Sequence, residues 1–226
     1  SIILPEPVSW VSQNFEDKLE GHLEQHILTY SNLELAYKAY AAFYDRADVD
    51  LPGFKKYFHK LEQRSHANAV SMTTYINKRG GYVQFPVVEL KDACSYIDKF
   101  LEKNSTSKKE NPNMCNYHSQ SQKSTGKKSY AKNVKDDSIN WRPISGLTGL
   151  EEALTLEKFV NRELISLAGQ AKFHRDPHAK LVIEAEMEHQ VDIIKEIADL
   201  VTRLRQYPPN KDYELGEYLL DRELSK

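Results

Sequence analysis

Residues 52–81 read PGFKKYFHKLEQRSHANAVSMTTYINKRGG and hold the pattern that decides the fold. Mostly apolar or small side chains recur there at alternating steps of four and three, the spacing of one stripe on a long α-helix. The stripe consists of Phe54, Phe58, Leu61, Ser65, Asn68, Met72 and Tyr75. Pro52 suits the first helical turn, because its φ angle is fixed and its missing N–H needs no partner there. Gly80 and Gly81 suit a helix end, so the stretch predicts a single long helix between Pro52 and Gly80.

Three further stretches on either side carry the same spacing, at 23–44, 147–168 and 183–204. The last follows Asp176 and Pro177, an N-cap carboxylate and a proline, and stops before Pro208. Each helix would hold about 27–30 residues and span roughly 40–45 Å. Two hairpins joined by a long crossover connection predict an all-α, up-down four-helix bundle, with a short fifth helix at 213–224.

Composition excludes several classes of protein. The 226 residues include 31 basic and 33 acidic side chains, for a formal net charge of -2, which argues against a dedicated nucleic-acid binder. No run of about 18 apolar residues occurs that would span a membrane. Two cysteines are too few for a disulfide-dense scaffold. One core of this size can be stable alone, so we expect a single domain over residues 1–226.

The crossover connection, residues 82–143, differs from the rest of the chain. Within its insertion at 103–140 there is no Leu, Phe or Trp, and eight lysines face three acidic residues. Such a segment cannot supply a core. We interpret it as a solvated surface loop, with a polyanion-binding patch as the alternative.

Secretion is indicated by three features, two of which lie in the same connection. Asn104 begins an Asn-Ser-Thr glycosylation sequon, the chain begins with Ser1 and not with Met, and Cys94 and Cys115 lie in or beside the insertion. Together they predict a secreted glycoprotein in which a Cys94–Cys115 disulfide closes the loop. The alternative is a cytoplasmic chain with two free thiols.

Seven short strings spread along the chain resemble landmarks of ferritin subunits. In order they are Gln13-Asn14-Phe15, residues 44–49 (YDRADV), residues 78–81 (KRGG), Leu156-Glu157-Lys158, Asp176-Pro177-His178, Ile194-Lys195-Glu196 and residues 216–219 (GEYL). The enlarged polar connection is similar to that of the secreted yolk ferritins of molluscs. The resemblance implies a ferritin-like bundle with a fifth helix, in a hollow shell of twenty-four subunits, homomeric or heteromeric. It also implies iron stored as a mineral, with no organic cofactor.

The resemblance also implies where iron would pass and where it would be deposited. Channels in the family are lined by acidic residues near the start of the fourth helix, where Glu184, Glu186 and Glu188 are candidates, or else form a solvated helix face. Mineral in the family nucleates on acidic residues of the inner surface. The matching face of the second helix is basic, so nucleation there is not expected: it holds Lys55, Lys56, His59, Lys60, Gln63 and Arg64.

A ferroxidase centre holds two irons and needs about five or six converging oxygen and nitrogen ligands. In the register that the landmarks fix, the family's ligands on the first two helices fall on Tyr30, Ser65 and Asn68. Glu157 remains as the candidate metal ligand, and Tyr37 and Gln190 remain with Tyr30 as remnants of the site. The resemblance therefore implies a light-chain-like subunit without an intact ferroxidase centre.

Glu34 carries the alternative interpretation. The strings at 32–35 and 64–67 look like the family's ligand strings displaced along the chain, and they would give an active ferroxidase built from Glu34, Glu62, His66 and Glu157. That alignment needs insertions and deletions inside two helices whose stripes are unbroken. A carboxylate on the core stripe needs a partner, so we expect Glu34 to meet Glu62 or His66 in a structural network. A cage that stores no iron, serving as a yolk nutrient or a protective particle, is a further alternative.

Overall fold

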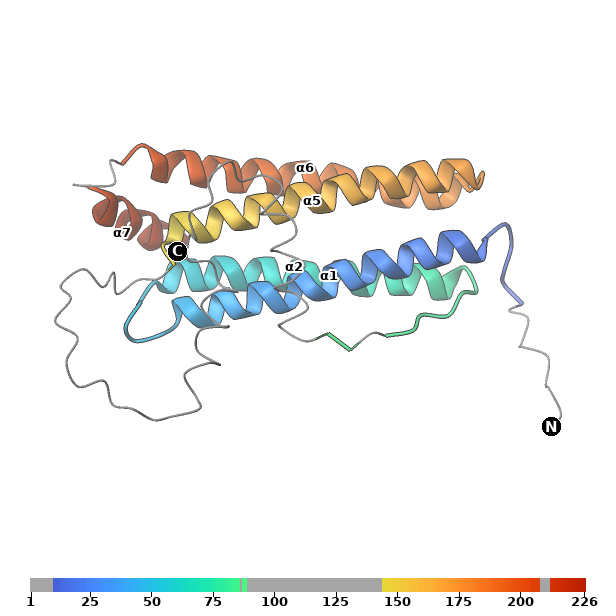
Figure 1. The fold of residues 1–226 in the computed structure, drawn as a ribbon, viewed down its shortest axis with the longest axis horizontal. Coiled ribbons are helices and arrows are strands. Elements are labelled where there is room, and N and C mark those ends of the chain that lie inside the picture. The colour runs from blue at the N-terminus through green and yellow to red at the C-terminus, as the bar shows by residue number, and fades with distance from the viewer. Residues whose placement is uncertain (1–9, 86, 89–143, 208–211) are drawn as a thin grey trace, which may run out of the picture.

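A computed structural model describes residues 10–85, 87–88, 144–207 and 212–226. Within these ranges the chain folds into five helices (Figure 1): α1 Asp17–Tyr44, α2 Pro52–Lys78, α5 Gly146–Phe173, α6 Pro177–Arg205 and α7 Tyr213–Leu224. The α1–α2 hairpin lies beside the α5–α6 hairpin, and α7 covers the end of the bundle where α2 and α5 begin. The all-α four-helix bundle with a short fifth helix is confirmed. None of the helices in the described ranges combines the length and the apolar character needed to cross a membrane.

The helix ends follow the predicted signals. Pro52 is the first residue of α2, and the helix stops at Lys78, ahead of Gly80, whose φ of 86° is left-handed. At the start of α6 the Asp176 side chain accepts a hydrogen bond from the backbone N–H of Ala179, at 2.9 Å. Proline, glycine and the N-cap carboxylate therefore set these boundaries.

Aromatic side chains fill the core at the α7 end of the bundle. Tyr40, Tyr44 and Phe54 are fully buried around Phe58. The ring of Phe58 stacks on Tyr40 at 4.8 Å between centroids and lies 5.3 Å from that of Tyr44. Such pairs contribute about 0.5–1.5 kcal/mol each beyond the burial of their area. This cluster ties α1 to α2.

The helix α7 is fixed by two buried carboxylates that cap other helices. Asp221 accepts hydrogen bonds from the backbone N–H groups of Gly53 and Phe54, at 2.7 and 3.0 Å, and Glu217 accepts one from Gly146 at 2.6 Å. These N–H groups belong to the first turns of α2 and α5, where the helix dipole favours negative charge. Gly53 allows the close approach, because a Cβ at this position would lie 1.9 Å from the carbonyl oxygen of Asp221.

Glu34 departs from the stripe expected for α1. Leu33 and Tyr37 are buried beside it, while Glu34 is partly exposed. After Tyr30 the buried line takes a step of three to Leu33 and then a step of four to Tyr37, so position 34 lies at the edge of the buried face. The expectation of a carboxylate in the core at position 34 is therefore wrong.

Candidate functional site

Glu157 on α5 is the centre of a polar layer inside the bundle. It is fully buried, and each of the three other long helices sends one side chain to its carboxylate. The Tyr37 hydroxyl on α1 donates to Oε1 at 2.7 Å. The Gln190 amide on α6 donates to Oε2 at 2.6 Å and to the Glu157 carbonyl at 2.9 Å. Three residues expected at the site, Glu157, Tyr37 and Gln190, are thus brought together.

Arg64 on α2 is the fourth member, and the sequence analysis missed this role. Its Nη1 donates to Glu157 Oε2 at 3.1 Å and its Nη2 to Gln190 Oε1 at 2.7 Å. The side chain is 21% exposed, so its stem enters from the surface of the bundle. The sequence placed Arg64 on the basic face of α2. One signal in the sequence could have identified Arg64. With Ser65 at the position of the family's ligand on the second helix, the buried carboxylate of Glu157 needs a positive partner, and Arg64 is the cation next to Ser65 in the sequence.

Tyr30 and Glu186 extend the layer toward α1 and α6. The buried Tyr30 hydroxyl donates to Glu186 Oε1. Burial, and after it the charge of Glu186, hold the pKa of Tyr30 well above its ordinary value. Burial and the charge of Glu157 do the same to the pKa of Tyr37. Both phenols therefore stay protonated at neutral pH and act as hydrogen-bond donors.

Glu186 differs from the two other candidate channel residues. Its carboxylate is bound by Tyr30, whereas Glu188 is exposed and Glu184 lies 3.3 Å from Lys180 in an ion pair on the surface of α6. Helical geometry explains the difference, because position 186 is one turn before Gln190 on the inward-facing side. Glu186 is thus half-buried and joined to the layer through Tyr30, and a channel role stays a prediction for all three glutamates.

Ser65 and Asn68 bring no metal ligand to the layer. The buried Ser65 hydroxyl donates to the carbonyl of Leu61 in its own helix, at 3.0 Å. Asn68 is partly exposed. Neither position supplies a carboxylate or an imidazole, so Glu157 has no acidic neighbour on α2 at these positions.

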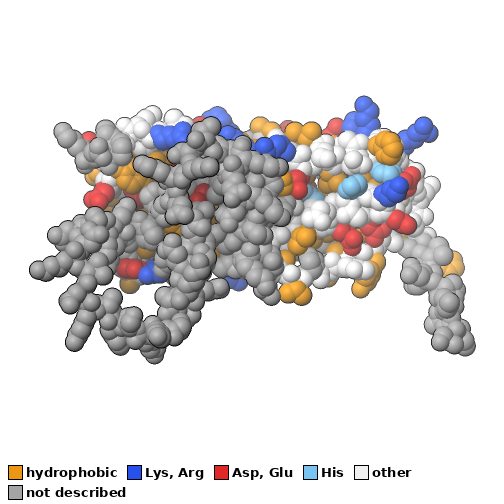
Figure 2. Space-filling view, viewed as in Figure 1, with side chains coloured by type: hydrophobic (Ala, Val, Ile, Leu, Met, Phe, Trp, Pro, Cys, Tyr) orange, Lys and Arg blue, Asp and Glu red, His pale blue; other side chains and the backbone are white. Residues whose placement is uncertain are grey.

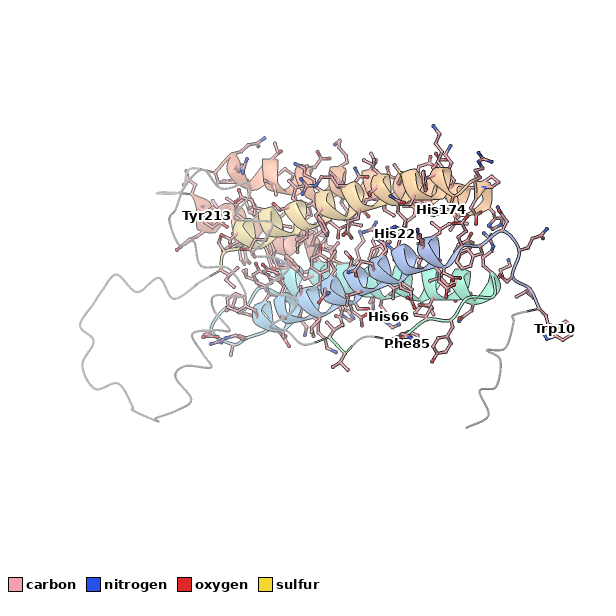
Figure 3. The ribbon with its side chains drawn as sticks, turned by 45° about the vertical axis from the view of Figure 1, so that its right-hand side comes forward. Trp10, His22, His66, Phe85, His174 and Tyr213 are labelled. Atoms are coloured by element: carbon pink, nitrogen blue, oxygen red, sulfur yellow. The ribbon has the colours of Figure 1, made fainter. Side chains whose placement is uncertain are left out.

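The residues of the displaced alternative lie in separate pairs on the flank of the α1–α2 hairpin. His66 Nδ1 lies 3.2 Å from Glu34 Oε2, and Glu62 is paired with His59 at 2.7 Å. Figure 3 shows His66 on the side of the hairpin turned away from α5 and α6. Across the described ranges no three His, Cys, Asp or Glu side chains are gathered closely enough to hold a metal ion. A combined site of Glu34, Glu62, His66 and Glu157 is therefore not formed, because positions 62 and 66 lie off the core stripe. Cys94, Asn104 and Cys115 lie outside the described residues.

Two helix hairpins joined by one long crossover connection, with a polar layer in the core of the bundle, are the architecture of ferritin-like bundles. The family model for the ferritin-like domain matches residues 20–207. The chain is 33% identical to the yolk ferritin of Lymnaea stagnalis, over 94% of this chain and 88% of the relative. It is 28% identical to the soma ferritin of the same snail, over 96% and 95% of the two chains. It is 26% identical to the oocyte isoform of the ferritin light chain of Xenopus laevis, over 95% and 94%. The chain belongs to the ferritin family.

Proposed function

We propose that this chain is a subunit of an iron-storing ferritin cage and that the core of its bundle does not oxidise ferrous iron. The observation that carries the second part is the guanidinium of Arg64, bound to both Glu157 and Gln190. Its Nη1 binds Oε2 of Glu157, one of the two oxygens that a metal ion would need. A single carboxylate with a fixed cation beside it does not fit a pair of ferrous ions.

Electrostatics supports this assignment. At about 4 Å and an effective dielectric constant of ~20, two unit charges interact by about 4 kcal/mol. A divalent ion beside the Arg64 guanidinium would meet roughly twice that repulsion. One carboxylate, Glu157, and a second that Tyr30 binds, Glu186, leave too little negative charge to offset it for two ions.

Storage as the overall role is supported by the ferritin relatives over nearly the whole chain. We extend the proposal to a shell of twenty-four subunits, homomeric or heteromeric, with iron as cargo. In a single chain, large apolar side chains are exposed to solvent at both ends of the bundle. They are Phe173 and Leu181 near the α5–α6 turn, and Leu215, Tyr218 and Leu219 on α7. Contiguous exposed apolar surface is typical of protein contacts.

A yolk or other secreted location is the finer part of the proposal. It is supported by similarity to a yolk ferritin and by the Asn104 sequon. Mass spectrometry of the native chain tests it in one measurement. A glycan at Asn104 and a Cys94–Cys115 disulfide are the expected results, whereas an unmodified Asn104 with free thiols would assign the protein to the cytoplasm.

Stopped-flow oxidation of ferrous iron by the purified homopolymer tests the missing centre. We expect slow oxidation close to the uncatalysed rate, with mineral still retained in the shell. Rapid oxidation typical of a ferroxidase would refute the proposal. Anomalous scattering from iron-soaked crystals separates the alternatives further. Iron density at Glu157, or between Glu34 and His66, would favour the alternative of an active ferroxidase. Iron absent from the native particle would contradict storage itself.

A further inference from the structure

His26 on α1 is a buried side chain whose hydrogen-bonding groups are unused. It is 2% exposed, and neither ring nitrogen has a hydrogen-bond partner. A neutral imidazole carries one donor and one acceptor, and leaving both unpaired in the interior is costly. Glu163 on α5 faces it, with 3.6 Å between Nδ1 and Oε2. That distance is too long for a hydrogen bond.

The same separation suits two ligands of one metal ion. Ligands about 2.0–2.1 Å from a tetrahedral ion lie roughly 3.3–3.5 Å from each other. The Glu163 carboxylate is already oriented by the buried Thr29 hydroxyl, which donates to Oε2 at 2.7 Å. Metal-binding carboxylates usually have such an outer partner. His26 and Glu163 are thus spaced and supported as a pair of ligands.

A cavity adjoins this pair in the groove between α1 and α5. It has a volume of about 110 Å³ and is lined by His22, His26 and Glu163, with a largely polar remainder. The space admits an ion with bound water. In the view of Figure 2, histidine surface appears on the half of the bundle away from α7, where this groove lies. Figure 3 shows His22 on α1, toward α5.

His22 can supply a third ligand. It lies four residues before His26 on the same helix, and two histidines at this spacing share one face, as in helical zinc sites. His22 is exposed, so its ring is free to change rotamer. As the side chains stand, no three such groups in the described ranges are gathered for a metal. Binding therefore requires His22 to turn toward the cavity.

We propose that His22, His26 and Glu163 form a site for a divalent transition-metal ion, Zn²⁺ or Fe²⁺, with water completing its coordination. Two imidazoles and one carboxylate bind such ions in preference to Mg²⁺ or Ca²⁺, which favour oxygen ligands alone. The site shares no residue with the Glu157 layer. Its test is therefore separate from the test of iron oxidation.

The experiment uses the purified full chain and Zn²⁺ or Co²⁺ alone. Crystals soaked in Zn²⁺ should show an anomalous peak about 2.0–2.2 Å from a ring nitrogen of His26 and a carboxylate oxygen of Glu163. Titration with Co²⁺, followed by its visible absorption, should give one site per chain that is lost or weakened at least roughly 10-fold in His22→Ala and Glu163→Gln. His189→Ala, which removes an exposed histidine on α6, is the matched control and should bind like the wild type.

Both informative variants change side chains that are not fully buried, so the fold should persist, and circular dichroism checks it. His26→Gln is a further variant, in which the buried ligand itself is replaced. A groove without an anomalous peak, or one that holds only water, would overturn the proposal. So would Co²⁺ binding that is unchanged in His22→Ala and Glu163→Gln.

Discussion

Replacing Arg64 tests whether its guanidinium neutralises the buried carboxylate of Glu157. Arg64→Met keeps an apolar stem of similar width but removes the guanidinium, and with it the charge and both hydrogen bonds. Hydrogen bonds to charged groups contribute about 1.5–3 kcal/mol, and breaking a buried pair costs about 3–5 kcal/mol. Because the Arg64 side chain is 21% exposed, water replaces part of the lost interaction. We therefore expect a loss of about 2–3 kcal/mol.

A double-mutant cycle with Glu157→Gln isolates the charge interaction. The neutral amide removes the charge of Glu157, and its single oxygen can accept from Tyr37 or from Gln190 but not from both where they now stand. That hydrogen bond is lost whether or not Arg64 is present, so the double variant should still lose less than the sum of the two single variants. We expect the coupling to be on the order of 1.5–3 kcal/mol. For a chain of this size, the loss in Arg64→Met alone corresponds to a fall in the thermal midpoint of roughly 4–12 °C.

Differential scanning calorimetry of the assembled protein, at one protein concentration, is the assay. Lys60→Met is the matched control. Lys60 lies on the same helix as Arg64, is 59% exposed, and pairs at the surface with Glu196 on α6 at 2.8 Å. That variant should change stability by less than about 0.5–1 kcal/mol. The reasoning fails if Arg64→Met unfolds at the same temperature as Lys60→Met, or if the two single effects simply add.

Three further predictions concern the rest of the bundle. Gly53→Ala should lower the free energy of unfolding by at least about 1–3 kcal/mol and expose α7 to proteolysis, because its Cβ would meet the carbonyl of Asp221. Gly169→Ala is the control: its Cβ would meet nothing, so the change should be neutral or stabilising by up to ~1 kcal/mol. Equal effects of the two substitutions would contradict this reasoning. Burial alone would raise the pKa of Asp176, but hydrogen bonds from an arginine and from the α6 backbone outweigh it and hold the pKa below its ordinary value. The stability that Asp176 contributes is therefore complete above about pH 4 and is lost as the pH falls through the lowered pKa. The thermal midpoints of the wild type and of Asp176→Asn should converge in acid. A difference between the two midpoints that does not depend on pH would disprove this account. His66→Ala should leave the rate of ferrous oxidation unchanged and should alter the free energy of unfolding by no more than about 1 kcal/mol. A slower oxidation rate would point to a displaced metal site.

The fold was predictable from the sequence because local and global signals agree. A stripe that continues through four stretches leaves one economical arrangement, in which the stripes face each other. Pro52 and the N-cap Asp176 mark helix starts by backbone chemistry alone, so those boundaries needed no knowledge of packing. The stripe errs by one position at Glu34, because steps of three and of four are both allowed after Tyr30 and the buried residue is Leu33.

The site was predictable only in part, because register identifies positions and not the reach of side chains. Glu157, Tyr37 and Gln190 lie on their stripes, and they were found through the register that the resemblance to ferritins fixes. Arg64 lies off the stripe of α2 and enters the layer through the length of its side chain, which periodicity does not describe. A charge balance would have found it, since a fully buried carboxylate requires a cation, a metal or protonation.

The same balance explains how the layer is stable without iron. A metal centre needs carboxylates whose oxygens are free to bind ions, and clustered carboxylates repel each other until the ions arrive. In this bundle Oε1 of Glu157 accepts from Tyr37, and Oε2 accepts from both Gln190 and Arg64. Every oxygen is satisfied by the chain itself, and the charge is compensated in the same contact. We infer that the Arg64 contact takes the structural role that a bound ion would have in this layer, so the packing around Glu157 needs no iron for its stability.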